Sequence, residues 1–278
     1  MSDAEMPVAH AAPPIVLTDD AAAAEVRAFD ALHEELDEWQ RQGRHCPLWW
    51  RDDDLIADSP ALHTMAEMAE RNGVPVMVAV IPALAHGNLA KDTAAMSLLS
   101  FCQHGLHHRN NEPVGAPSSE FGGSRPADAL AADLREGRDR MGALFGERFL
   151  PVFVPPWNRM RADAMPILKE LGMRGASLYH GQTAGFGKVL PVINAHVDIL
   201  LWTPRPPTQC RPTQALIERL VTLLRNSRAT AEPATPLGIL THHRPMLDDA
   251  WTFMQRLFDA SKAHGCVRWL SPSELFPA

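Results

Sequence analysis

Two patterns of hydrophobic and polar residues alternate along this chain. Continuous apolar runs at residues 74–81, 150–154 and 237–241 are typical of strands that are buried on both faces of a parallel sheet. The segments between them carry apolar residues at helical spacing. Strand and helix alternate in this way about seven times, which predicts a parallel sheet covered by helices, either closed into a barrel or left open.

Capping residues mark several helix ends. The first helix is expected from residue 19 to about residue 42, where Gly43 would stop it. Ser59 is a cap, Pro60 suits the first helical position, and this second helix is expected to run to Gly73. Further helices are expected at residues 126–145, 162–171, 213–225 and 248–264, and further strands at 47–50, 96–102, 176–179, 196–202 and 267–269.

The length of 278 residues allows one large α/β domain with a substantial core. Residues 1–18 are rich in Ala and Pro and are expected to be a loosely ordered extension, so the single domain is expected to cover residues 19–278. Residues 110–125 are rich in Gly, Pro and Ser and are expected to form a long loop. A loop of this length inside a compact domain is usually functional or disordered.

Composition excludes several classes of function. Charged residues make up 21% of the chain and the net charge is −7, so no basic face for nucleic acid is expected. The sequence has no apolar run of roughly 18 residues or more, and its first residues lack the pattern of a secretory signal. The four cysteines are scattered without a CxxC pair, as expected of reduced thiols. We therefore expect a cytoplasmic protein that binds neither nucleic acid nor membrane, whereas its oligomeric state leaves no readable pattern.

Polar residues suited to catalysis follow four of the expected strands. They form the segments 51–54 (RDDD), 104–108 (HGLHH), 155–158 (PPWN) and 241–243 (THH). In barrels of alternating strands and helices, the loops at the carboxyl ends of the strands converge on one cavity. The four segments are therefore expected to share one pocket.

The first two segments supply the ligand types of a hydrolytic metal site. Zn²⁺ takes imidazole and carboxylate ligands, and a catalytic site needs three of them with one position left for water. An acidic triplet can also be a solvated turn, but here it ends an apolar run, where a cation or Arg51 would have to offset the mutual repulsion. His104 and His108 would face the same way on a helical turn, although no Glu follows His104 as in HExxH. Cys102 is a weaker competing ligand.

The other two segments leave alternatives open. His242 at a strand end is a third nitrogen ligand, a general acid, or a polar plug in the rim. A general acid is favoured, because amide hydrolysis needs a proton for the leaving amine and histidine titrates in that range. The 155–158 segment is either functional or only a rigid turn. Trp49 and Trp50 either stack on a sugar ring or belong to the core.

These segments, in this order, resemble the motifs of the polysaccharide deacetylase (NodB-homology, carbohydrate esterase family 4) superfamily, and more closely its divergent, unsecreted bacterial members. Residues 51–54 resemble the family's Thr-Phe-Asp-Asp, and residues 104–108 its His-Ser-x-x-His. Residues 154–158 resemble its Arg-x-Pro-Tyr motif and residues 240–242 its Leu-His motif, while 196–198 match its Asp-bearing strand. The resemblance extends over nearly the whole expected core.

The resemblance implies a distorted (β/α)₇ barrel, here with an extra N-terminal helix, and one divalent metal ion, with Zn²⁺ the first candidate. By register, Asp53 would be the general base and Asp54 a metal ligand beside His104 and His108. A slip of one position would give these roles to Asp52 and Asp53. In the mechanism that we expect from these residues, His242 is the general acid and Asp198 tunes or orients it. The remaining motif residues are expected to bind substrate, namely Arg51, Pro156, Trp157, Asn158 and His243.

Three positions depart from the family pattern. The arginine that pairs with the base is replaced by Val154, so Arg51 or Arg159 would have to supply its charge. The serine of the second motif is Gly105, and the aspartate after the final histidine is His243. These changes leave the metal ligands intact but put the handling of a polymer substrate in doubt.

The sequence thus predicts a metal-dependent hydrolase that cleaves an N-acetyl C–N bond on a carbohydrate or related small molecule. Two alternatives remain. One is a metal-dependent amidohydrolase that acts on a non-sugar amide, and the other is a non-catalytic member that binds carbohydrate. Neither the substrate nor the metal can be read from the sequence.

Overall fold

The computed structural model describes residues 19–278 except 182–187, 203–207 and 231–232, so the expected extension at residues 1–18 lies outside the described residues. The strands of the main sheet are β1 (Cys46–Leu55), β2 (Val76–Val80), β3 (Leu99–His104), β4 (Phe149–Val154), β5 (Gly175–Ala176), β6 (Ala195–Asp198), β9 (Leu237–Thr241) and β10 (Val267–Trp269). Their order is β5-β4-β3-β2-β1-β9-β6, with β10 paired to β1, and the pairings are parallel.

The sheet is curled into a half-barrel, as the expected distorted (β/α)₇ barrel requires. Single parallel bridges, Ala176 to Val192 and Tyr179 to Ala195, connect the β5 end of the sheet to the β6 end. All strands of the sheet therefore send their carboxyl ends toward one rim.

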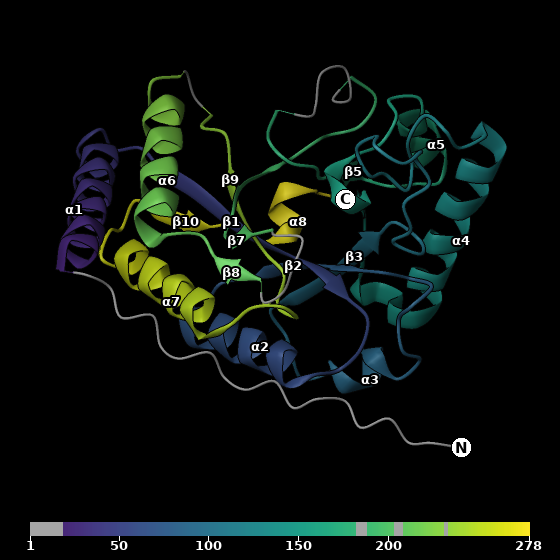
Figure 1. Ribbon diagram of the computed structural model, residues 1–278, viewed down its shortest axis with the longest axis horizontal. Coiled ribbons are helices and arrows are strands. Elements are labelled where there is room, and N and C mark those ends of the chain that lie inside the picture. The colour runs from purple at the N-terminus through teal and green to yellow at the C-terminus, as the bar shows by residue number, and fades with distance from the viewer. Residues whose placement is uncertain (1–18, 182–187, 203–207, 231–232) are drawn as a thin grey trace.

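Helices cover the outside of the sheet on two sides (Figure 1). They are α1 (Asp19–Arg41), α2 (Pro60–Asn72), α3 (Leu89–Asp92), α4 (Ala127–Phe145), α5 (Ala164–Glu170), α6 (Thr213–Arg228), α7 (Asp248–Lys262) and α8 (Pro272–Leu275). Helices α1, α6 and α7 lie together on one side, and α4 and α5 lie on the other. The expected extra N-terminal helix is α1, which packs on α6. The Ser59 hydroxyl caps α2 by accepting the N–H of Leu62, and Gly73 ends it at a φ of 66°.

Strand β1 is longer than expected, because it continues to Leu55 and includes the whole acidic triplet. Alternate side chains of a strand point to opposite faces. Trp49 belongs to the apolar cluster inside the barrel, while Trp50 belongs to the outer cluster under the helices. The same alternation places Arg51 and Asp53 on the inner face. Both tryptophans are about 1% exposed, so of the two alternatives the structure favours the core over stacking on a sugar.

Two of the expected strands end earlier in the structure. At each end a side-chain oxygen accepts a backbone N–H in place of a carbonyl group of a neighbouring strand. The strand expected at 176–179 stops early, since the N–H of Leu178 donates to the Asn194 side chain. The strand expected at 196–202 breaks after β6, because the Asp198 carboxylate accepts the N–H of Leu200. The chain then forms β7 (Leu200–Leu201), which pairs antiparallel with β8 (Gln209–Cys210).

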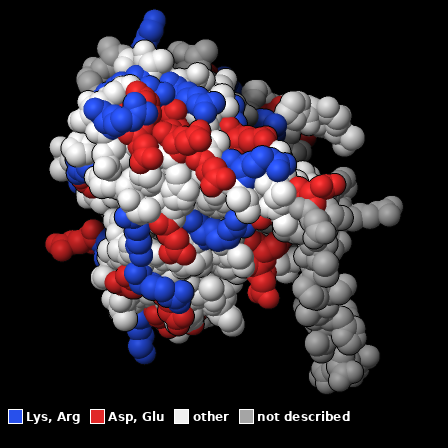
Figure 2. Space-filling view, turned by 90° about the vertical axis from the view of Figure 1, so that its left-hand side faces the viewer, with Lys and Arg blue, Asp and Glu red and all other residues white. Residues whose placement is uncertain are grey.

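The surface agrees with the mixed composition. Basic and acidic side chains are interspersed on the face that carries α1 and α6 (Figure 2). Among the helices that the structure describes, none is long and apolar enough to cross a membrane.

One buried histidine predicts that stability depends on pH. His196 on β6 is 5% exposed, and its Nδ1 accepts the backbone N–H of Gly238 at 3.1 Å. Burial lowers the pKa of His196 to about 4, with help from the charges of His180 and Arg219. In the unfolded chain this histidine has an ordinary pKa near 6.5. Between about pH 6.5 and 4, His196 is therefore protonated in the unfolded chain but neutral in the folded chain.

We expect acid to reduce the free energy of unfolding over this window by about 3 kcal/mol through His196, with the full contribution present above pH 6.5. The measurement is urea unfolding at pH 7 and pH 4.5, in chelator, of the wild type and of His196→Asn, whose side-chain oxygen can still accept the Gly238 N–H. The pH dependence should be smaller in the variant. Equal losses in both proteins would contradict the assignment to His196.

Candidate metal centre and active site

A cavity of about 340 Å³ opens at the carboxyl ends of the strands, as the barrel predicts. Side chains from all four polar segments line it, including Asp53, Asp54, His108, Trp157 and His242. The segments that are far apart in the sequence therefore do meet in one pocket.

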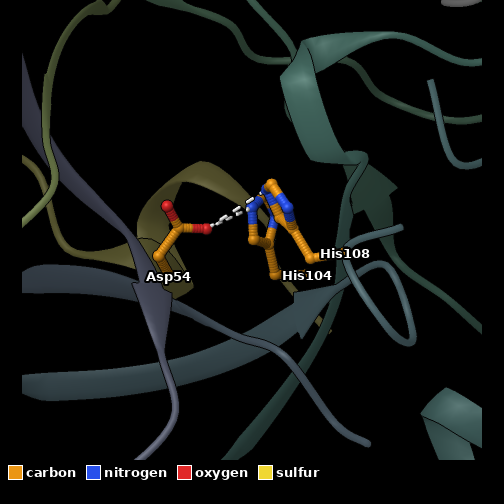
Figure 3. A group of neighbouring side chains, drawn as sticks. All are labelled: Asp54, His104 and His108. Atoms are coloured by element: carbon orange, nitrogen blue, oxygen red, sulfur yellow. Dashed lines mark ion pairs between the residues drawn. The ribbon is translucent and has the colours of Figure 1, made fainter. Parts of the chain in front are cut away.

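Asp54, His104 and His108 point at one another inside this cavity (Figure 3). The Nε2 atoms of His104 and His108 lie 3.2 Å and 3.3 Å from the same oxygen, Asp54 Oδ1. The ligand atoms of all three residues lie within 4.8 Å of one another. Imidazole and carboxylate at this spacing are a donor set for Zn²⁺ or a similar divalent cation.

The two histidines do not converge by a helical turn, so that part of the expectation is wrong. His104 is the last residue of β3, and the chain then turns through Gly105 at a φ of 59° and reaches His108 at a φ of 54°. Asp54 also has a positive φ of 73°. Left-handed backbone at residues other than glycine costs conformational energy and is concentrated at functional sites.

The protonation of His104 tests whether a cation fits this centre. Its Nδ1 lies 3.0 Å from the carbonyl oxygen of Val154, which can only accept, so Nδ1 carries the proton. In the neutral ring Nε2 then directs its lone pair at the Asp54 carboxylate. Two lone pairs at this distance repel unless a positive charge lies between them. A metal ion supplies that charge, and a histidine that donates its other N–H to a carbonyl is typical of metal ligands.

In the absence of a cation, the charges of the centre act on the protonation of its side chains. Burial opposes the charged forms of both Asp54 and His104, but their attraction outweighs it. The pKa of Asp54 is therefore held below its ordinary value, chiefly by His104, and the carboxylates of Asp53 and Asp54 raise the pKa of His104. Burial and the charge of His104 lower the pKa of His108, which keeps this imidazole neutral and able to coordinate.

Asp53 lies beside the centre in an ion pair with Arg51. The two side chains make contacts of 3.0 Å from Nη2 to Oδ2 and from Nε to Oδ1. Arg51 is fully buried and also donates to Ser177 Oγ, to the carbonyl oxygen of Leu178 and to Asn158 Oδ1. Arg51 is thus the residue that supplies the charge missing at Val154. It is not free to bind substrate as expected.

Asp52 faces away from the cavity. Its Oδ1 lies 2.5 Å from His243 Nδ1, and its Oδ2 accepts from Thr241 Oγ1 and from the His243 backbone N–H. Both oxygens are therefore used in tying β1 to the end of β9. This geometry favours the register in which Asp53 and Asp54 face the cavity. It also buries His243 completely, so the expected contact of His243 with substrate is not supported.

His242 lines the cavity next to Trp202, whose ring stands edge-on to the imidazole with centroids 4.6 Å apart. Trp202 Nε1 donates to Asp198 Oδ2 at 2.8 Å. Within the described part of the chain, His242 Nδ1 is buried without a hydrogen-bond partner. Among the described residues, Asp198 is thus connected to His242 through the Trp202 ring and not by a direct hydrogen bond.

The 155–158 segment forms a tight turn at the edge of the cavity. Pro156 is buried, while Trp157 and Asn158 have φ values of 54° and 57°. The Trp157 ring packs on His108 with centroids 4.4 Å apart, and Asn158 holds Arg51. The segment thus supports the metal centre on one side and the Asp53 ion pair on the other.

The comparisons with known proteins concern the fold. No family model matches the chain, and no curated protein matches its sequence. Among solved structures, a peptidoglycan N-acetylglucosamine deacetylase in complex with 4-naphthalen-1-yl-N-oxidanyl-benzamide is similar, with a TM-score of 0.51 and 14% identity over 83% of this chain and 87% of that chain. A mutant of a CE4 family pseudoenzyme, with restored enzymatic activity, has a TM-score of 0.53 and 15% identity over 83% of this chain and 67% of that chain.

The chain has the carbohydrate esterase family 4 fold. At these identities the likeness concerns the fold, and the chemistry of this chain has to be argued from its own residues.

Within this fold Glu120 is a residue that the motif pattern missed. It is 1% exposed, and its carboxylate accepts the backbone N–H groups of Leu106, His107 and His108 at 3.2, 2.7 and 3.2 Å. Three N–H donors on one buried carboxylate fix the turn that carries His108. Glu120 lies in the segment expected to be a long loop, where its sequence context gave no signal.

Gly105 is explained by the same carboxylate. A Cβ atom at this position would lie 2.1 Å from Glu120 Oε2 and 2.6 Å from the Pro156 ring. A serine side chain therefore has no room here, and the φ of 59° favours glycine as well. The change from the family's serine is thus a consequence of placing a buried glutamate under the turn.

We expect Glu120→Ala to weaken metal binding by about 10-fold to 100-fold, as groups that orient metal ligands commonly do. Glu120→Gln should be milder, because its amide oxygen can still accept. The measurement is competition of each protein with a chromophoric chelator for Zn²⁺. Glu112→Ala is the matched control, since Glu112 lies in the same loop and bonds to Ser124 rather than to the turn. Equal zinc affinity of wild type and Glu120→Ala would contradict this role.

Proposed function

We propose that the protein is a metal-dependent deacetylase that hydrolyses an N-acetyl group on a carbohydrate or a related small molecule. The observation that carries the proposal is the convergence of Asp54, His104 and His108 in a cavity that Asp53 and His242 also line. A set of three ligands with a carboxylate and an imidazole beside it is what metal-assisted amide hydrolysis requires. The volume of about 340 Å³ suits a small molecule.

Asp54, His104 and His108 would hold one divalent cation, for which Zn²⁺ is the first candidate. A cation bound there polarises the acyl carbonyl group and lowers the pKa of water. Asp53 takes the proton from the attacking water. Arg51 contacts both oxygens of this carboxylate at 3.0 Å and so fixes its orientation beside the cavity.

His242 then gives a proton to the departing amine nitrogen. Asp198 holds Trp202 against the imidazole and so keeps His242 in position. The backbone N–H of Trp157 is proposed as a second donor to the developing oxyanion. Pro156 and Asn158 shape the turn that presents it.

The experiment that tests the proposal measures acetate released from a panel of N-acetylated sugars. We expect the zinc-loaded protein to release acetate from at least one of them. Removal of the metal with a chelator should abolish the release, and added Zn²⁺ should restore it.

The same panel separates the alternatives. Release of formate or ammonia from small amides, without acetate from sugars, would make the protein an amidohydrolase on non-sugar amides. Metal bound in stoichiometric amount without turnover of any compound would make it a non-catalytic member of the fold. Release of acetate that is insensitive to the chelator would contradict the metal-dependent mechanism.

A further inference from the structure

Within the part of the chain that the structure describes, two arginines at the cavity have no acidic partner. Arg159 and Arg211 both line the cavity, Arg159 from the turn after β4 and Arg211 from the segment after β8. Among the described residues no carboxylate forms an ion pair with either guanidinium. By contrast, Arg51 in the same site has Asp53 as its partner.

Both side chains are nevertheless anchored by hydrogen bonds to the backbone. Arg159 Nη1 donates to the carbonyl oxygen of Ser118, and Arg211 Nε donates to the carbonyl oxygen of Asp198. Each guanidinium has five N–H donors, so each keeps donors for a ligand. A neutral carbonyl partner fixes the position of the group but leaves its positive charge uncompensated. Arg211 is half-buried and Arg159 is exposed at the edge of the cavity, and the hydrogen bond of each one restricts its side chain before a ligand binds, which reduces the conformational entropy lost on binding.

The charge balance of the site points the same way. Three carboxylates line the cavity, those of Asp53, Asp54 and Asp198. Two guanidinium groups line it as well, those of Arg159 and Arg211, and the fully buried Arg51 pairs with Asp53. A divalent cation at the three ligands therefore leaves the site with a net positive charge, which favours a negatively charged molecule over a neutral one.

We propose that the substrate is a small anionic N-acetylated compound, a single acetamido sugar carrying a phosphate or a carboxylate, and that Arg159 and Arg211 recognise its anionic group. Arginine matches both anions through paired N–H donors. The cavity volume of about 340 Å³ accommodates such a compound rather than a long segment of polymer. This inference rests on the proposed function, since it names the substrate class of the same site.

The test measures binding to the zinc-loaded protein by calorimetry with three probes. These are N-acetylglucosamine, N-acetylglucosamine 6-phosphate and 2-acetamido-2-deoxyglucuronate, which differ in the charged group. We expect at least one anionic probe to bind about tenfold or more tightly than the neutral sugar, as charge-assisted hydrogen bonds allow. The tighter of the two anions identifies the chemistry that the arginines recognise.

A bound metal ion also attracts anions, so variants are needed to distinguish the contribution of the arginines to anion binding from that of the metal. Arg159→Gln/Arg211→Gln should lose the preference for the anionic probe and keep the affinity for the neutral sugar. Arg140→Gln, on the exposed surface of α4, is the matched control and should keep the preference. The single variants and the thermal unfolding midpoints show whether a loss is local.

Equal affinity for neutral and anionic probes would overturn the inference, as would binding of none of the anions. A preference that survives in the double variant would assign it to the metal and overturn the role of the arginines. Tight anion binding without acetate release from any sugar of the panel would overturn the deacetylase proposal and leave only the recognition of the anion by the arginines. Efficient deacetylation of the neutral sugar without any anion preference would overturn this inference alone.

Discussion

Replacing both His104 and His108 with alanine is expected to reduce the bound metal from about one ion per chain to a small fraction of that, since two of the three ligands are lost. The remaining ligand, Asp54, is a single carboxylate whose oxygen now faces an empty space. Turnover should disappear together with the metal. The measurement is elemental analysis of the purified protein after dialysis against a metal-buffered solution.

His107→Ala is the matched control for this variant. His107 lies in the same turn, but its side chain is exposed and is not part of the ligand group, and only its backbone N–H bonds to Glu120. We expect His107→Ala to keep both metal and fold. Wild-type metal content in the double variant would show that the ion is bound elsewhere, and the deacetylase proposal would be contradicted as well.

The course of the fold could be predicted because its signals are local. Continuous apolar runs gave the buried strands β2, β4 and β9, and a capping serine and a terminal glycine gave the ends of α2. Signals of this kind need no knowledge of distant residues. The ends of the edge strands were wrong because side chains of Asn194 and Asp198 replace backbone partners there. Such substitutions depend on which segments meet in space.

The candidate metal ligands could be predicted from the sequence, but the residues that hold them in position could not. His104 and His108 were found by their spacing, yet the reason given was wrong, because a left-handed turn and not a helix brings them together. The turn depends on Glu120, which lies 12 to 14 residues further along the chain in a segment without periodicity. The sequence offered two arginines, Arg51 and Arg159, as the partner of Asp53. It did not decide between them, because the alternation of side chains along a strand does not show how far a guanidinium group reaches.

His243 illustrates the same limit. Its position after a strand suggested a role at the rim, like that of its neighbour His242. The backbone instead directs His243 into the protein, where Asp52 binds it, and directs His242 into the cavity. One residue of register thus separates a buried structural pair from a candidate catalytic group, and only the pairing of β1 with β9 decides between them.

Replacing Asp53 with asparagine is expected to lower kcat by about 10²-fold to 10⁴-fold, the usual contribution of a general base. Asparagine has nearly the same shape, and its side-chain oxygen can still accept from Arg51. Arg51 also keeps its bonds to Ser177, Leu178 and Asn158, so its buried charge is not left without acceptors. The variant should therefore remain folded and retain its metal while losing turnover.

The measurement compares kcat, metal content and thermal unfolding midpoint in one preparation. Asp58→Asn is the matched control, because Asp58 follows β1, is exposed and pairs only with His63 in the described structure. If Asp53→Asn kept full activity, proton transfer would have to be assigned to another group. If it lost the metal instead, Asp53 would be a ligand, and the register of β1 would have to be reassigned. Retained metal with lost turnover is the result that separates a base from a ligand, because Asp53 and Asp54 are adjacent on one strand and face different partners, Arg51 and the two histidines.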